Sequence, residues 1–120
     1  MGKYNKQAPG DTPGYVYLLH CENGLYKVGR SAWPETRVTE LRHQNGIRGT
    51  LLWKLQCADM VTTERALHQR LAQYHANREL FDLPAVVVEW LCQQTEASAC
   101  EGYDPSQFKR TDARGYRVGR

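Results

Sequence analysis

The pattern of apolar and polar positions near the N-terminus predicts a β-hairpin. Residues 15–20, Tyr-Val-Tyr-Leu-Leu-His, are aromatic and β-branched, as strand residues tend to be, and residues 25–29, Leu-Tyr-Lys-Val-Gly, have the character of a returning strand. Asn23-Gly24 lies between the two runs, and this dipeptide is the strongest short signal for a hairpin because both residues tolerate a positive φ. Two antiparallel strands are therefore expected at the start of the fold.

A helix is expected to follow the hairpin. Pro34 suits the first helical position because its φ is already fixed at a helical value. Val38 and Leu41 then share one face, which can pack against the strands. Asn45-Gly46 supplies a stop, because helices commonly end in a left-handed residue that is usually glycine.

Further elements alternate after this helix. Residues 51–57, Leu-Leu-Trp-Lys-Leu-Gln-Cys, predict a third strand that is central and largely buried. Asp59 can cap a second helix. The apolar stripe of that helix consists of Met60, Leu67, Leu71 and Tyr74. Residues 77–83 are expected to be a short irregular or extended piece, and Pro84 opens a third helix that runs to about Glu96.

The order of these elements predicts an α+β fold, β-β-α-β-α-α, in which helices flank a small antiparallel three-stranded sheet. A length of 120 residues suits one domain with a single modest core. We place that domain at residues 14–97. Residues 1–13 contain glycine, proline and several polar residues and are expected to be a flexible lead-in, and residues 98–120 a basic, flexible tail.

Composition narrows the class of protein without pointing to a function. Hydrophobic residues make up 41% and charged residues 24% of the chain, as in an ordinary globular protein. No apolar run approaches the roughly 18 residues of a membrane span, and the first residues lack the apolar stretch of a secretory signal. A cytoplasmic protein with no membrane partner is therefore expected. The four cysteines show no CxxC pair or other zinc-ligand spacing, which favours reduced thiols.

The net charge of +3 is unevenly distributed. Five basic residues lie after residue 107 against one acidic residue, Asp112, so that segment alone carries +4 and the rest of the chain −1. A basic terminal arm can bind the phosphates of a nucleic acid. A solvated tail without such a role has the same composition, so the sequence leaves both interpretations open.

Polar and charged side chains in the hairpin are candidates for a site. Alternation places Tyr15 and Tyr17 on the same face of the first strand, where they can either contact a ligand or serve as amphipathic core residues. Lys27 and Arg30 begin a basic cluster at one end of the returning strand, although a lone lysine at such a position is often a solvated edge residue. Gly29 permits close approach of another group to the backbone.

The first two helices carry charged residues beside their apolar faces. Arg37 lies at the edge of the first helix's apolar face, where an arginine can reach a site or extend its end into solvent. Glu64 lies at the margin of the second helix's stripe, with His68 one turn further on. Burying an unpaired carboxylate is costly, so Glu64 needs a partner. An ordinary ion pair with an arginine and a functional site fit this position equally.

The order and spacing of these residues resemble the GIY-YIG nuclease superfamily, in particular a compact branch common in phages and other mobile elements. The tripeptide Tyr-Val-Tyr that ends at Tyr17 corresponds to the first motif, and the tripeptide Lys-Val-Gly that begins at Lys27, ten residues on, to the second. Arg37 lies ten residues after the start of the second motif, and Glu64 lies on the next helix after a strand, as in the family. The resemblance covers residues 14–83.

Two further segments are similar to that branch: the Glu-x-x-Leu-His pattern of residues 64–68 and the segment Arg-Glu-Leu-Phe of residues 78–81. The resemblance implies a metal-dependent DNA endonuclease, a hydrolase of phosphodiester bonds with the family's α+β fold. One Mg²⁺ or Mn²⁺ ion, held by Glu64 through oxygen ligation, would serve the phosphate and the leaving group.

The resemblance also implies roles for the other candidates. Arg37 would stabilise the negative charge that develops on the phosphate. Tyr17 would contact or deprotonate the nucleophilic water, with its pKa lowered by adjacent cations such as Lys27. Arg30 would hold an adjacent phosphate, and His68 would assist proton transfer.

The chain departs from the better-characterised nucleases at two positions. They carry tyrosine where this chain has Lys27, and only Asn77 is a candidate for the asparagine usually found after the metal glutamate. Two functions therefore stay open: an active endonuclease, and a catalytically inactive DNA-binding or protein-interaction module of phage or plasmid origin. Trp33 or Tyr103, if exposed, would suit contact with a protein. The oligomeric state is not indicated.

Overall fold

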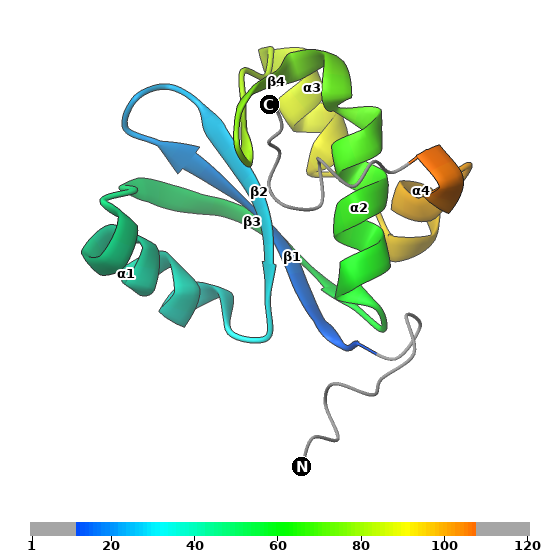
Figure 1. Cartoon of the computed structure of the whole chain (residues 1–120), viewed down its shortest axis with the longest axis horizontal. Coiled ribbons are helices and arrows are strands. Elements are labelled where there is room, and N and C mark those ends of the chain that lie inside the picture. Colours follow the sequence, from blue (N-terminus) through cyan, green and yellow to red (C-terminus); the bar gives the residue numbers. More distant parts are fainter. Residues whose placement is uncertain (1–11, 108–120) are drawn as a thin grey trace.

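Strands β1 (Gly14–Cys21) and β2 (Tyr26–Ser31) form the expected hairpin in the computed structural model, which describes residues 12–107 (Figure 1). Gly24 in the connecting turn has a φ of 91°, a left-handed conformation that glycine adopts without strain. The prediction of an antiparallel pair at the start of the fold is confirmed.

The sheet has five antiparallel strands in the order β3-β1-β2-β5-β4, so the prediction of a three-stranded sheet is wrong. The two additional strands, β4 (His75–Asn77) and β5 (Leu80–Phe81), are too short to show the alternation by which strands are recognised in a sequence. Arg78 lies between them with a positive φ of 50°, which closes the tight turn. The α+β class, with helices flanking the sheet, is as predicted.

Strand β3 (Gly49–Cys57) lies at one edge of the sheet, so the expectation that it is central and largely buried is wrong. Its side chains alternate between partly buried and exposed positions along most of the strand. Leu52 takes one of the exposed positions of this alternation, and the β1–β3 pairing is irregular there, between the partners of Leu18 and Leu19. This exposed leucine makes an edge strand resemble a buried one in the sequence.

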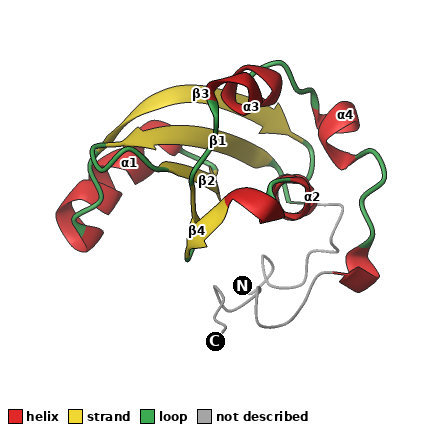
Figure 2. Ribbon diagram, turned by 90° about the horizontal axis from the view of Figure 1, so that it is seen from above, coloured by secondary structure: helices red, strands yellow, loops and turns green. Residues whose placement is uncertain are grey.

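Helices cover both faces of the sheet (Figure 2). Helix α1 (Pro34–Asn45) begins with a proline and ends at Gly46, which has a φ of 69° and donates its N–H to the Leu41 carbonyl. Leu41 packs into a small cluster on its face of the sheet. That cluster, the α1-side core, consists of Tyr17, Leu19, Cys21 and Leu41.

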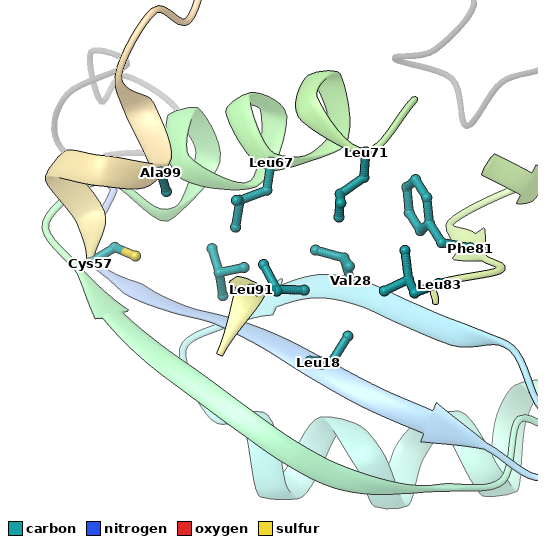
Figure 3. Packing of buried hydrophobic residues seen from close by; sticks show 10 residues of the cluster. Leu18, Val28, Cys57, Leu67, Leu71, Phe81, Leu83, Leu91 and Ala99 are labelled. Atoms are coloured by element: carbon teal, nitrogen blue, oxygen red, sulfur yellow. The ribbon is translucent and has the colours of Figure 1, made fainter. Parts of the chain in front are cut away.

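Helix α2 (Met60–Arg70) lies on the opposite face. Asp59 caps it as predicted, because its carboxylate accepts hydrogen bonds from the N–H groups of Val61 and Thr62. Leu67 and Leu71 point from α2 and its C-terminus toward the strands (Figure 3). They belong to the α2-side core, which consists of Val16, Leu18, Val28, Cys57, Leu67, Leu71, Phe81, Leu83, Leu91 and Ala99. A short 3-10 helix, η2 (Ala72–Tyr74), follows.

The third helix, α3 (Ala85–Leu91), is shorter than expected, and a separate helix, α4 (Glu96–Cys100), begins where the expected helix should end. Thr95 and Ser98 form a capping box that starts α4 as a helix of its own. Ala99 is fully buried, so the folded part continues past residue 97. The last described element is the 3-10 helix η3 (Pro105–Gln107).

The predicted lead-in and the basic tail fall largely on residues 1–11 and 108–120, which lie outside the described residues. Between residues 12 and 107, no helix is both long enough and apolar enough to cross a membrane. The candidate residues of the hairpin and of the first two helices, in contrast, fall within this described range.

Candidate active site

The Tyr17 ring lies across β2 and requires a glycine beneath it. The strand register pairs Tyr17 with Gly29. A Cβ atom added to Gly29 would lie 2.6 Å from the Tyr17 hydroxyl oxygen and 2.7 Å from the ring carbon that bears it. The ring is almost completely buried, so it has little freedom to move aside. Gly29 of the second motif therefore leaves the space that the ring of Tyr17, from the first motif, occupies.

Tyr17 lies near the open end of β2. Strand β5 pairs with β2 only at Tyr26 and Lys27, so in the described sheet the following residues 28–31 have β1 as their strand partner. Side chains from both helix layers and from the β4–β5 turn gather at this end. We call this group the candidate site, and it consists of Tyr17, Lys27, Arg30, Arg37, Glu64, His68 and Glu79.

Charged groups from three elements act on the Tyr17 hydroxyl. Burial is the main effect and raises the pKa of Tyr17 far above its ordinary value. Arg37 on α1 opposes this through its charge and a hydrogen bond, whereas the carboxylates of Glu79 and Glu64 raise the pKa further. Tyr17 is therefore neutral at physiological pH. The pKa is raised overall, so the net lowering expected from cations such as Lys27 is not found.

Glu64 is a buried carboxylate whose partner is an arginine of β2. Glu64 is 6% exposed, and Arg30 Nη1 lies 2.5 Å from its Oε1 atom. The register pairs Arg30 with Val16, so its side chain lies on the face that α2 covers. His68 Nε2 lies 3.9 Å from the other carboxylate oxygen. The ion pair that was one alternative from the sequence is present, and it lies inside the candidate site.

His68 is held by the backbone of β2. Its Nε2 atom lies 2.8 Å from the carbonyl oxygen of Val28, the first residue of β2 beyond the pairing with β5. A carbonyl oxygen can only accept, so Nε2 carries the proton and donates it in this hydrogen bond. The ring also packs edge-on against Phe81 of β5. These contacts fix the orientation of His68 beside Glu64.

Lys27 is buried and forms an ion pair with Glu79 in the β4–β5 turn. Burial alone would raise the pKa of the Glu79 carboxyl. The ammonium group of Lys27 and its hydrogen bond, together with the charges of His68 and Arg30, instead hold that pKa below its ordinary value of 4.5. Glu79 thus connects the lysine on the α1 side with the histidine and arginine on the α2 side.

Arg37 reaches the site from the N-terminal end of α1. Its backbone N–H donates to the Trp33 carbonyl oxygen at 2.9 Å, and its Nη1 atom lies 3.3 Å from Glu40 Oε1. The side chain stays 37% exposed while its charge acts on the Tyr17 hydroxyl. A guanidinium in this position can keep one edge toward the tyrosine and present the rest of its donors to solvent or to a ligand.

The carboxylates suit one mode of metal binding. Within residues 12–107 no group of three or more His, Cys, Asp and Glu side chains could hold a metal ion by itself. Mg²⁺ in phosphate-processing sites usually keeps several waters and takes only one or two carboxylates, with substrate phosphates completing its shell. The single buried carboxylate of Glu64 fits that mode, and Arg30 then has to share or release one of its oxygens.

The structure brings together all six residues that the sequence singled out: Tyr17, Lys27, Arg30, Arg37, Glu64 and His68. Asn77 is not part of this group, because it is exposed on the outermost strand β4. Glu79 was missed as a site residue. The resemblance of residues 78–81 to the nuclease branch was the only feature of the sequence that pointed to Glu79. Its ion pair with the buried Lys27 depends on the β4–β5 turn, which the sequence pattern does not predict.

Comparison with known protein families gives a match over most of the chain. The model of the T5orf172 domain matches residues 14–96, which include every residue of the candidate site. No curated protein and no solved structure matches the chain. Since the matched segment spans well over half of the chain and coincides with the sheet, its helices and the site, the chain belongs to the T5orf172 domain family.

Proposed function

We propose that this domain is a metal-dependent DNA endonuclease that hydrolyses phosphodiester bonds with GIY-YIG-type chemistry. The family supports a DNA-related function, since the T5orf172 domain is phage-derived and is found in some homing-endonuclease-like proteins. One observation carries the proposal. The buried Tyr17 ring lies directly against Gly29 of β2, and the next residue, Arg30, holds the buried carboxylate of Glu64 at 2.5 Å on the other face of the sheet.

Phosphodiester hydrolysis requires charge neutralisation at the non-bridging oxygens, an activated water and a stabilised leaving oxygen. Arg37 supports the first requirement, because its partly exposed guanidinium can donate two parallel hydrogen bonds to a phosphate. Arg30 is 42% exposed and can turn from Glu64 toward a second phosphate of the same strand. Both arginines would thus exchange a carboxylate partner for a phosphate when DNA binds.

Glu64 is the residue that would hold a divalent ion, Mg²⁺ or Mn²⁺. A bound ion supplies Lewis-acid stabilisation of the phosphate and the leaving oxygen. Release of Glu64 by Arg30 and binding of a phosphate by Arg30 are coupled in this arrangement, because one guanidinium serves both partners. Glu64 therefore becomes a better ligand when the substrate is present.

Tyr17 acts in this proposal as a neutral hydrogen-bonding group. Its hydroxyl interacts with Arg37 and remains protonated, so it can orient a water molecule or donate to a phosphate oxygen. His68 donates its Nε2 hydrogen to the Val28 carbonyl oxygen, and this hydrogen bond fixes its ring beside Glu64. His68 is therefore a positioning residue for Glu64. Lys27 with Glu79 occupies the position at which better-characterised nucleases have a tyrosine, and adds a fixed ion pair next to the hydroxyl.

The decisive experiment is cleavage of supercoiled plasmid DNA by the full chain with Mn²⁺ or Mg²⁺. Glu64→Gln keeps the size of the side chain and removes the charge that would bind the ion. Loss of a contribution of several kcal/mol predicts a rate at least about a hundredfold lower. Arg37→Ala is expected to reduce the rate by a similar factor, since it removes a donor for the developing charge.

Two surface variants serve as matched controls for the two site variants. Glu89→Gln on α3 and Arg42→Ala on α1 alter exposed residues of the same types on the described surface and are expected to cleave like the wild type. Circular dichroism confirms that each variant is folded. Cleavage that survives in both Glu64→Gln and Arg37→Ala would show the proposal to be wrong.

A second candidate function, a DNA-binding module without cleavage, is favoured by the internal pairing of the site. Arg30 with Glu64 and Lys27 with Glu79 neutralise one another. Such a module would bind DNA in a salt-dependent manner. Wild-type protein that binds plasmid DNA but leaves it intact with either metal would decide for this alternative.

A further inference from the structure

Trp33 is the most exposed large apolar side chain among the described residues. It lies in the loop between β2 and α1, and 73% of its surface is accessible. Trp53 and Trp90, the other two tryptophans, pack against the α2-side core. The indole of Trp33 therefore contributes little to the core, although it could bury more apolar surface than almost any other side chain.

The backbone beneath this indole is held on both sides. The Trp33 N–H donates to Ser31 Oγ at 2.9 Å, and its carbonyl oxygen accepts from the Arg37 N–H at 2.9 Å. Pro34, the next residue, is buried and fixes the start of α1. The loop thus presents an exposed aromatic ring from a well-fixed position, which lowers the entropic cost of using it for binding.

Basic residues of the candidate site flank Trp33 along the chain. Arg30 precedes it by three residues and Arg37 follows by four, and both guanidinium groups are partly exposed. Glu35 is the nearest carboxylate in the sequence, and Lys54 pairs with it at 2.6 Å. Trp33 thus lies in a segment whose two arginines can exchange their carboxylate partners, Glu64 and Glu40, for the phosphates of an anionic polymer.

We propose that Trp33 stacks on an unpaired nucleobase of DNA bound at the candidate site, so that the preferred substrate carries unpaired nucleotides next to the bond to be cleaved. This inference rests on the proposed function, because Arg30 and Arg37 bind the phosphates on either side. In a duplex both faces of each internal base are covered by its neighbours. A fixed indole can therefore stack only on a base that has lost a neighbour or has left the helix.

A nucleobase explains this surface better than a protein partner does. Protein-binding tryptophans lie in apolar patches from which water is excluded. The other exposed large apolar residues on the described surface are Leu52 on β3 and Val86 on α3, separate elements that do not adjoin the loop in the sequence. Trp33 instead lies, along the chain, between two arginines that belong to the site.

Binding of labelled oligonucleotides to the full chain, in EDTA to prevent cleavage, tests the inference. We compare a single-stranded oligothymidine with a blunt duplex of the same length. Trp33→Ala is expected to weaken binding of the single strand about tenfold or more, because stacking on an aromatic side chain contributes on that scale. Duplex binding, which depends on the phosphates, should change by about twofold or less. Trp33→Tyr should restore most of the affinity.

Val86→Ala, an exposed apolar residue of α3, is the matched control and should leave both affinities unchanged. Equal weakening of single strand and duplex by Trp33→Ala, or no weakening of either, would overturn the inference. The cleavage assay separates it from the proposed function. Tryptophan-dependent binding of the single strand without cleavage by wild type upholds the inference alone, whereas cleavage with no effect of Trp33→Ala on single-strand binding upholds the function alone.

Discussion

The two faces of the sheet are packed differently. On the face that α2, α3 and α4 cover, ten buried residues form the α2-side core, and nearly all of them are aliphatic or aromatic. On the face that α1 covers, the α1-side core has four residues, of which Tyr17 carries a hydroxyl and Cys21 a thiol. Buried Lys27 lies on the same face, opposite Leu19. The apolar packing is thus more extensive on the α2 face, whereas the site takes buried positions from both faces, Tyr17 and Lys27 from one and Glu64 from the other.

The position of the site at the margin of both cores explains how a small domain can hold these buried charges. A buried ion pair gains little over an apolar pair and is costly when one partner is lost. The candidate site lies where the α1-side core ends and β2 has no β5 partner within the described sheet, so its charges are close to solvent on at least one side. The α2-side core can then remain apolar and provide the free energy of folding.

The largest effect should come from a leucine deletion in each core. Leu67→Ala removes a fully buried side chain of the α2-side core, and we expect the free energy of unfolding to fall by about 3–5 kcal/mol. Leu41→Ala in the α1-side core should cost about 2–3 kcal/mol, because fewer buried neighbours surround the cavity. Urea denaturation measures both, and an equal or greater loss for Leu41→Ala would contradict the comparison.

An effect of intermediate size is expected at Gly29, where the Tyr17 ring packs directly against the backbone of β2. Gly29→Ala places a methyl group against the buried Tyr17 ring, and we expect a loss of about 1–3 kcal/mol together with lower plasmid cleavage. Gly14→Ala is the matched control in a strand of the same sheet. There the new methyl group meets the flexible end of Met60, which can move away at small cost. Equal losses in the two variants would show that the Tyr17 ring is not fixed by Gly29.

Much of this arrangement follows from the sequence because it depends on local signals. The Asn-Gly turn, the proline at the start of α1, Asp59 at the start of α2 and the apolar stripe of α2 each determine an element within a few residues. The positions of Tyr17, Arg37 and Glu64 on those elements could be predicted together with them. Glu64 was expected to need a partner, and Arg30 is that partner.

The remainder depends on contacts between distant segments. The strands β4 and β5 have three and two residues and form only through pairing with one another and with β2, so no periodic pattern marks them. Glu79, the partner of Lys27, lies in the turn of that small hairpin, 52 residues further along the chain. The pKa of Tyr17 was misjudged for a related reason. Nearby cations can be inferred from spacing, whereas the complete burial that outweighs them depends on packing from α1.

The smallest effect should come from the Lys27–Glu79 pair, which tests whether the α1 face retains a stabilising charge pair. Glu79→Gln removes the carboxylate and leaves the buried lysine with a weaker acceptor. Because Glu79 is 45% exposed, solvent screens the interaction, and we expect a loss of only about 0.5–1 kcal/mol near pH 7. Glu22→Gln in the exposed β1–β2 turn is the control and should cause no such loss.

The pH dependence of this difference has a defined sign. The pKa of Glu79 is lower in the folded protein than its ordinary value of 4.5, so its contribution to stability is complete above that pH. As the pH falls through the lower folded-state pKa, the carboxylate becomes protonated and the contribution disappears. The free energies of unfolding of wild type and Glu79→Gln should therefore converge in acid. A difference that stays constant from neutral to acidic pH would mean that Glu79 stabilises the fold through packing, and that the charge of Lys27 is accommodated by other groups at the open end of β2.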